Sequence, residues 1–188
     1  MLVELVSKSA QIVIEENRQL IRHQVKKRSR FENWLQLEIF KKILMECPSL
    51  SVDVERSYPL GKGRCDFWCK SEDGVDEWVE LKLCVTNYCR TSSESSSNRP
   101  ITTQISDVVR DSLKLQAVTE SVGARSILLL VYPLPADFRC HVQWNIHLDK
   151  LRCEAGAISE YFFSHIHDDD LSAYVAAYGI KIAACGAE

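Results

Sequence analysis

Asp66 and the segment Glu80-Leu81-Lys82 carry the residue types that could do chemistry together. Thirteen residues separate Asp66 from Glu80. Two carboxylates that lie close together repel each other, and one of them takes up a proton unless a cation is present. A divalent metal with oxygen ligands and free positions for water, Mg²⁺ or Mn²⁺, relieves that repulsion. These residue types therefore predict a site for a divalent metal, provided that the fold brings them together.

Two strands joined by a tight turn would position these residues. The strands are expected over 64–70 and 76–85, with Gly74 in a left-handed turn between them. Side chains alternate along a strand, so Glu80 and Lys82 share one face with Trp78 and Cys84. The other face of the second strand is apolar: Val79, Leu81, Leu83 and Val85. The first strand is expected to turn three residues toward a core (Cys65, Phe67, Cys69) and three away from it (Arg64, Asp66, Trp68).

The other elements follow from hydrophobic periodicity. Apolar residues recur at helical spacing over 3–28, 31–47 and 101–118, and Pro48 ends the second of these helices. An alternating strand is expected over 50–58, and a strand covered on both faces over 125–132, stopped by Pro133 and Pro135. A helix over 137–152 and late elements over 157–165 and 171–182 complete the chain.

An acid on one strand with Glu-x-Lys on the next resembles the PD-(D/E)xK nuclease superfamily, which has the restriction-endonuclease-like fold. The resemblance covers roughly Phe31 to Val131, although Cys65 replaces the proline that precedes the aspartate in the family motif. That proline contributes no ligand. The expected order, helix, three strands, helix and strand, matches the αβββαβ core of the superfamily. The resemblance implies one α/β domain over 1–188, with a central mixed sheet flanked by helices and an extra N-terminal helix over 1–28.

The resemblance also implies the roles of the central residues. Asp66, Glu80 and the backbone carbonyl of Leu81 would bind Mg²⁺ or Mn²⁺. Lys82 would orient the attacking water and help to deprotonate it, because the pKa of a lysine can fall beside a metal or on burial. The implied activity is metal-dependent hydrolysis of phosphodiester bonds in nucleic acid, with DNA as the expected substrate.

Two helices would complete such a site. In the superfamily the first core helix often presents a glutamate to the metal; Glu38 matches by position and would bind directly or through water, with Glu32 as the second choice. The helix after the Glu-x-Lys strand often points a glutamine at the site, which makes Gln104 the candidate. Gln104 shares a polar helix face with Asp107, Asp111 and Lys114.

Composition constrains location and partners. The formal net charge is −3, yet residues 1–30 carry seven Lys and Arg against three Glu, a local excess that could meet phosphate. Eight cysteines without the spacing of a secreted scaffold, and no signal peptide, indicate an intracellular, cytoplasmic protein with reduced thiols. No apolar stretch approaches the ~20 residues of a membrane span. A homodimer or a larger complex stays open.

Other interpretations compete with the nuclease. A non-catalytic member of the same fold would bind nucleic acid or a protein partner, and an unrelated α/β interaction protein would carry the charged strand as mere surface. Cys65, Cys69, Cys84 and Cys89 lack the usual spacing of a zinc or iron–sulfur site. His165 and His167 precede three aspartates and could bind a metal, but a solvated acidic turn is favoured. The serine-rich segment 88–100 is expected to form an exposed loop beside the site.

Overall fold

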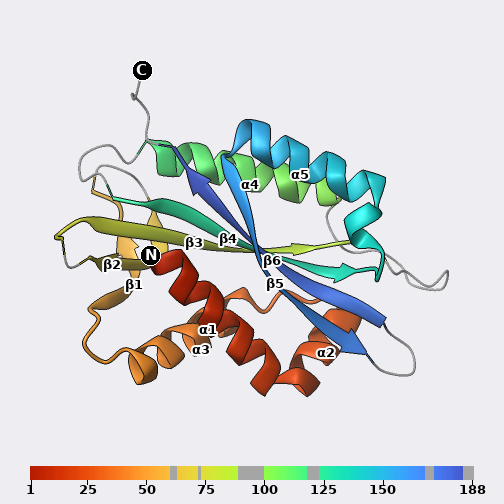
Figure 1. Cartoon of the computed structure of the whole chain (residues 1–188), viewed down its shortest axis with the longest axis horizontal. Helices are drawn as coiled ribbons and strands as arrows, with labels where there is room; N and C mark the ends of the chain where they lie inside the picture. Colours follow the sequence, from red (N-terminus) through yellow and green to blue (C-terminus); the bar gives the residue numbers. More distant parts are fainter. Residues whose placement is uncertain (60–62, 72, 89–99, 118–122, 168–171, 184–188) are drawn as a thin grey trace.

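A six-stranded mixed sheet with helices on both faces forms the protein (Figure 1). The computed structural model describes residues 1–59, 63–71, 73–88, 100–117, 123–167 and 172–183. The strands lie in the order β1-β2-β3-β4-β6-β5. Their bounds are β1 Val52–Ser57, β2 Arg64–Lys70, β3 Asp76–Val85, β4 Arg125–Leu134, β5 Ala157–His167 and β6 Ser172–Ile182.

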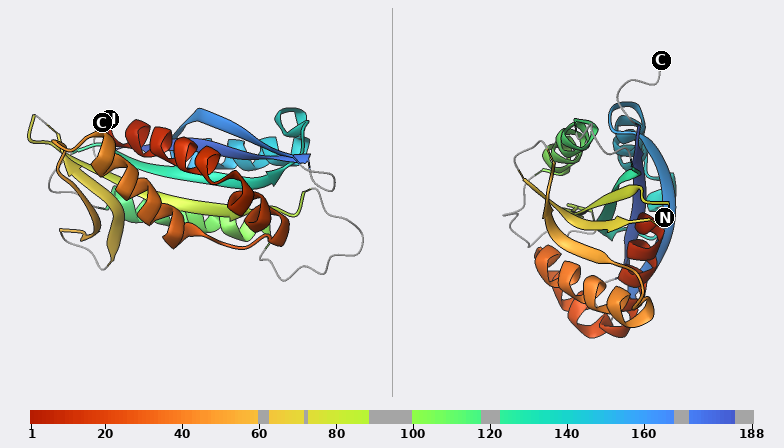
Figure 2. Two further views of the ribbon diagram at one scale, coloured as in Figure 1. Left: turned by 90° about the horizontal axis from the view of Figure 1, so that it is seen from below. Right: turned by 90° about the vertical axis from the view of Figure 1, so that its left-hand side faces the viewer.

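The helices form one layer on each side of this sheet. Figures 1 and 2 show α1, α2 and α3 together on one face and α4 and α5 on the other. Their bounds are α1 Leu2–Glu16, α2 Arg18–Lys27, α3 Glu32–Glu46, α4 Ile101–Gln116 and α5 Val142–Glu154, with a short 3₁₀ helix at Phe138–Cys140. The order α3-β1-β2-β3-α4-β4 is the order of elements that the sequence predicts.

The N-terminal segment forms two helices, so the prediction of one helix over 3–28 is wrong. The break lies at Asn17, whose side-chain amide and backbone N–H both donate to the carbonyl of Val13, at 2.8 and 3.1 Å. An asparagine side chain that bonds nearby backbone competes in this way with helix continuation. Both helices belong to the core, because Ile14 of α1 and Ile21 of α2 are fully buried in one cluster with residues of the sheet.

The three strands β1, β2 and β3 form an antiparallel meander, and β3 pairs in parallel with β4 through the crossover helix α4. All ten residues of β4 are buried, as its unbroken apolar run predicts. The strand extends through Pro133 to Leu134 and stops before Pro135, so its predicted end at Tyr132 is wrong by two residues. Parallel strands need such a crossover, which brings the start of α4 next to the end of β3.

Because the sheet is covered on both faces, there are two hydrophobic cores. Phe67 and Cys69 of β2 lie in the core under α1–α3, whereas Cys65 and Trp68 lie in the core under α4 and α5. The prediction that Trp68 faces away from a core is therefore wrong, and its ring centroid lies 6.2 Å from that of Trp78. No helix among the described residues is long and apolar enough to cross a membrane.

Candidate functional site

The strands β2 and β3 part before β3 ends. Their pairing runs from Lys70 and Asp76 to Phe67 and Val79, and β3 then continues to Val85. On its other side β3 stays paired with β4 along this length. The N–H groups of Leu81, Leu83 and Val85 point toward the side that β2 has left. These donors need other partners, since an unpaired buried N–H is costly.

Three polar side chains bond these backbone groups, one from each surrounding element. Asp66 of β2 accepts from the N–H of Leu81 at 2.6 Å, and Glu32 of α3 accepts from the N–H of Leu83 at 3.1 Å. Gln104 of α4 accepts from the N–H of Val85 at 3.0 Å and donates to its carbonyl at 2.8 Å. The open edge of β3 is thus lined with side chains that converge from β2, α3 and α4. We call this stretch, from Leu81 to Val85, the β3 edge.

Asp66 and Glu80 form a carboxylate pair at the mouth of this opening. Only 8% of Glu80 is exposed, and the Tyr58 hydroxyl donates to its Oε1. Burial, followed by the charge of Glu80, raises the pKa of Asp66 to about 8, although the hydrogen bond from the Leu81 N–H and the charge of Lys82 oppose this rise. Gln36 of α3 donates to the Asp66 backbone carbonyl at 3.1 Å. The pair therefore holds a proton at neutral pH, because burial and the mutual repulsion of two adjacent carboxylates outweigh the neighbouring charge of Lys82.

Lys82 lies between this pair and the helix α4. Its ammonium is 3.4 Å from Glu80 Oε2 and 3.4 Å from Asp111 Oδ2. Burial alone would lower the pKa of Lys82, but the carboxylates of Glu80, Asp111, Asp66 and Glu32 together raise it above its ordinary value. The carboxylates thus outweigh burial, and Lys82 is a cation at neutral pH.

Of the two candidate glutamates on α3, the structure places Glu32 at the β3 edge. Glu38 pairs with Lys41 on the same helix, 3.4 Å away, and a third of its side chain is exposed. Within the part of the chain that the structure describes, Glu38 does not gather with Asp66 and Glu80 into a group that could hold a metal, so this geometry does not support the assignment by position to Glu38. The α3 helix begins at Glu32, so its first turn, and not its middle, approaches β3.

A pocket of ≈ 320 Å³ opens beside Lys82, between β3 and α4. It is rich in charge: Arg30, Lys82, Arg110 and Lys114 face Glu32, Asp107 and Asp111. Cations therefore outnumber carboxylates by one in a chain whose formal net charge is −3. Asp66 and Glu80 do not line this pocket, and Lys82 separates them from it.

The oxygen atoms at this site are of the kind that binds hard cations, but they are few. Among the described residues, no three His, Cys, Asp or Glu side chains gather to hold a metal. Asp66 and Glu80 supply two carboxylates. In an extended strand the N–H and C=O of one residue point to the same side, so the carbonyl of Leu81 faces the opening with Asp66. Two carboxylates and one carbonyl suit Mg²⁺ or Mn²⁺ with water in the remaining positions.

The other metal candidates gain no support. Cys65, Cys69 and Cys84 are buried thiols, and they divide between the two cores. Cys89 and residues 168–170 lie outside the described residues, as does most of the predicted loop over 88–100. His165 and His167 lie on β5 with their ring centroids 5.6 Å apart.

Sequence reasoning missed two partners of the carboxylate pair, Tyr58 and Gln36. Tyr58 follows β1 and belongs to no recognisable sequence motif. Gln36 is the only amide in the middle of α3 and is 7% exposed, so it stands out as a functional candidate only once its burial is known. Asp111 was expected on the polar face of α4 and pairs with Lys114, but its contact with Lys82 was not foreseen. Asp107 pairs with Arg110.

Comparisons with family models, curated proteins and solved structures gave no significant match. The site therefore rests on its own geometry.

Gln104 should contribute to stability whatever the site does. We expect Gln104→Leu to lower the free energy of unfolding by about 2 kcal/mol, because both the N–H and the C=O of Val85 lose their partner in a buried position. Urea denaturation would measure this. Gln19→Leu, at an exposed position of α2, is the matched control. An equal stability of the two variants would contradict the inferred role of Gln104.

Proposed function

We propose that this protein is a metal-dependent nuclease with a PD-(D/E)xK-type site. The observation that supports the proposal is the convergence of Asp66, Glu80 and Lys82 where β2 and β3 part. The motif consists of the residue types and their spacing. It carries no information about the opening between the two strands, which is therefore a separate observation. We further propose that α3-β1-β2-β3-α4-β4 is a restriction-endonuclease-like αβββαβ core. Nucleic acid is the proposed substrate, with DNA as the first choice.

In this proposal Asp66, Glu80 and the carbonyl of Leu81 hold Mg²⁺ or Mn²⁺. The raised pKa of Asp66 fits this role, because a cation would replace the proton that the pair now holds. When bound, the metal would polarise the phosphodiester and favour deprotonation of an attacking water. Glu32, which accepts from the Leu83 N–H, would act on Lys82 and the β3 edge, and not as a ligand.

The role proposed for Lys82 is that of a fixed cation. The surrounding carboxylates raise the pKa of Lys82, so its ammonium is protonated at neutral pH before a metal binds. A buried ammonium aimed at the carboxylate pair can orient water and stabilise the negative charge that develops on a phosphate oxygen. The Tyr58 hydroxyl, which donates to Glu80, keeps that carboxylate in place.

A non-catalytic nucleic-acid-binding protein is the second candidate. It is favoured by one observation: the site groups already have partners within the protein. Asp66 and Gln104 bond the β3 edge, and Lys82 pairs with Glu80 and Asp111. A polar cluster whose only role is to bond the unpaired edge of β3 would have the same hydrogen bonds and ion pairs.

Cleavage assays separate the two candidates. The protein would be incubated with supercoiled plasmid and with linear single-stranded DNA, in Mg²⁺, Mn²⁺ or EDTA. We expect cutting only with metal, and a loss of about a hundredfold or more in Glu80→Gln, which lacks one ligand charge. Glu46→Gln, at an exposed position of α3, is the matched control. Retention of DNA without cutting under every condition would favour the second candidate, and neither cutting nor retention would refute both.

A further inference from the structure

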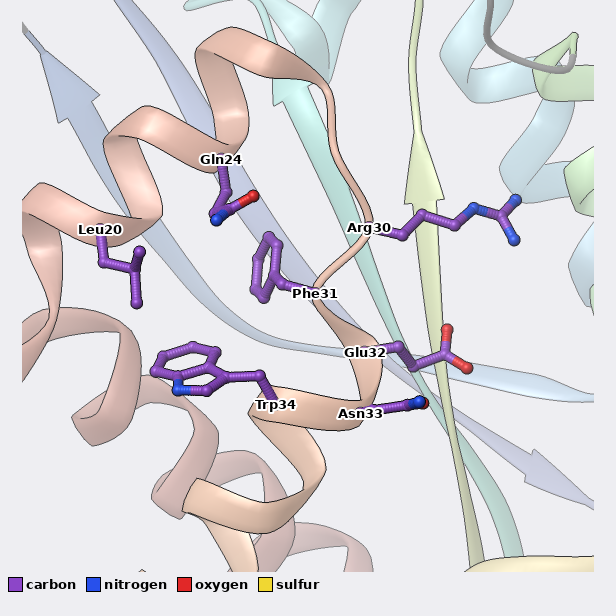
Figure 3. A pocket seen from close by; sticks show the side chains of 7 residues that line it. All are labelled: Leu20, Gln24, Arg30, Phe31, Glu32, Asn33 and Trp34. Carbon is purple, nitrogen blue, oxygen red and sulfur yellow. The ribbon is translucent and has the colours of Figure 1, made fainter.

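A larger pocket, of ≈ 570 Å³, lies between α2 and the start of α3 (Figure 3). The nuclease proposal does not use it. Its lining comes from α2 and from the segment that leads into α3: Leu20, Gln24, Arg30, Phe31, Glu32, Asn33 and Trp34. Its volume is in the range of ~300–1,000 Å³ that small-molecule sites occupy.

One half of this pocket is apolar and aromatic. In Figure 3 the rings of Phe31 and Trp34 point toward Leu20 and Gln24 of α2. Phe31 is buried and packs edge-on against Trp34, with 6.1 Å between ring centroids, so it holds the indole in place. Trp34 itself is partly exposed, and Leu20 is 41% exposed. A fixed, accessible indole with an aliphatic wall is a surface on which a flat aromatic ligand can stack.

The other half is polar and leads to the proposed catalytic site. Figure 3 shows Arg30, Glu32 and Asn33 pointing away from the aromatic half, toward β3. Arg30 and Glu32 also line the pocket beside Lys82, so the two pockets share a wall. The Arg30 guanidinium reaches Gln104 Oε1 at 3.4 Å, and the Arg30 residue is exposed. A phosphate bound by Arg30 would thus lie between the stacking surface and Lys82.

The helix that forms the outer wall is basic. Residues Arg18–Lys27 include Arg18, Arg22, Lys26 and Lys27, and no Asp or Glu. Lys27 is exposed and continues the row of Leu20 and Gln24 along the helix, since residues three and four apart share a face. Basic side chains beside an aromatic platform are the combination that binds single strands of nucleic acid.

We propose that this pocket binds one unpaired nucleobase of a single-stranded nucleic acid, stacked on Trp34. The phosphate next to that base would meet Arg30, and the strand would then pass toward Lys82. The proposal deepens the proposed function and depends on it for the direction of the strand, but the base pocket itself can be tested without cleavage. A base held in a duplex cannot enter the pocket, so single strands, or duplexes with unpaired ends, are the preferred ligands.

Tryptophan fluorescence in EDTA tests the pocket directly. Trp68, Trp78 and Trp144 are 8%, 2% and 0% exposed, so among the four tryptophans Trp34 is the one that a ligand can contact. We expect short oligothymidylate or oligouridylate to quench the fluorescence, and a sugar-phosphate strand of equal length without bases to leave it unchanged. The two oligonucleotides report whether the sugar matters. No quenching by either one overturns the proposal.

Variants and fluorescence anisotropy give the second test. Trp34→Ala should weaken binding of the oligonucleotide about tenfold or more and remove the preference for a strand with bases over one without them. Trp34→Phe should retain most of the affinity while losing the quenching. Leu37→Ala, on the exposed face of α3 and outside the pocket, is the matched control. Because Trp34 packs on the core, thermal unfolding by circular dichroism must show that each variant is folded.

The outcomes separate this proposal from the nuclease. Binding that depends on Trp34 in a protein that never cuts DNA or RNA would support the pocket and refute the proposed activity. Metal-dependent cutting with the same affinity in the wild type and in Trp34→Ala would refute the pocket and leave the activity in place.

Discussion

Lys82→Met is expected to lower metal-dependent cleavage by about 10²–10³-fold while metal binding is retained. Methionine has a similar length and fills a similar volume, but it removes the ammonium that lies 3.4 Å from Glu80. Asp111 keeps its ion pair with Lys114 in this variant, so the surroundings retain a partner. Single-turnover cleavage of DNA, together with calorimetric titration of Mn²⁺, would measure the two effects separately.

The pH dependence of cleavage distinguishes a fixed cation from a base. A fixed cation stays charged throughout the neutral range, so the cleavage rates of the wild type and of Lys82→Arg should change with pH in the same way. Arginine keeps the charge but not the shape of the ammonium, so Lys82→Arg should fall between the wild type and Lys82→Met. Lys181→Met, at an exposed position of β6, is the control. Full activity in Lys82→Met would rule out the assignment of Lys82.

Asp66→Asn is expected to stabilise the metal-free protein at alkaline pH while abolishing cleavage. The pKa of Asp66 is raised from 3.8 to about 8 in the folded protein, so between these values the folded state holds a proton that the unfolded chain has released. Stability therefore falls as the pH rises through this interval, by up to about 1.4 kcal/mol per pH unit. Asparagine is neutral at every pH and can still accept from the Leu81 N–H.

Urea denaturation at two pH values tests this expectation. From about pH 5 to pH 8 the stability of Asp66→Asn relative to the wild type should increase by at least about 2 kcal/mol. Mg²⁺ should stabilise the wild type at pH 8 and have little effect on the variant, because a ligand that binds only the folded state raises its stability. Asp53→Asn, on the exposed side of β1, is the matched control. Wild-type stability that runs parallel to that of Asp66→Asn across this pH range would disprove the inferred proton at the carboxylate pair.

The prediction of the fold succeeded where one local pattern decides an element. The turn around Gly74, the alternation from Trp78 to Val85 and the unbroken apolar run of β4 are local signals, and the structure has each element there. One error arose where a side chain met a distant partner. Trp68 was assigned to an exposed face because its strand alternates, yet a second helical layer covers that face. Alternation shows that two faces differ, but not that one of them meets water.

The candidate site shows the same division. Asp66, Glu80 and Lys82 could be named from sequence because their spacing reflects two adjacent strands, and alternation puts Glu80 and Lys82 on one face. Glu38 was preferred to Glu32 by position, but both lie on one helix and the choice depends on which turn of α3 approaches β3. The packing of α3 brings Glu32 to the N–H of Leu83 and leaves Glu38 with Lys41.

The amino-acid sequence by itself determined the strands, the kinds of charged group and their spacing, because these depend on local periodicity and on the chemistry of each side chain. Only the tertiary structure decided that the pairing of β2 with β3 ends at Phe67 and Val79. It also decided that side chains from β2, α3 and α4 bond the unpaired edge of β3, and that carboxylates from four elements surround Lys82. The physical reason is that hydrogen bonds and pKa values at this site depend on groups far apart in the chain. Their distances exist only once the helices have packed on the sheet.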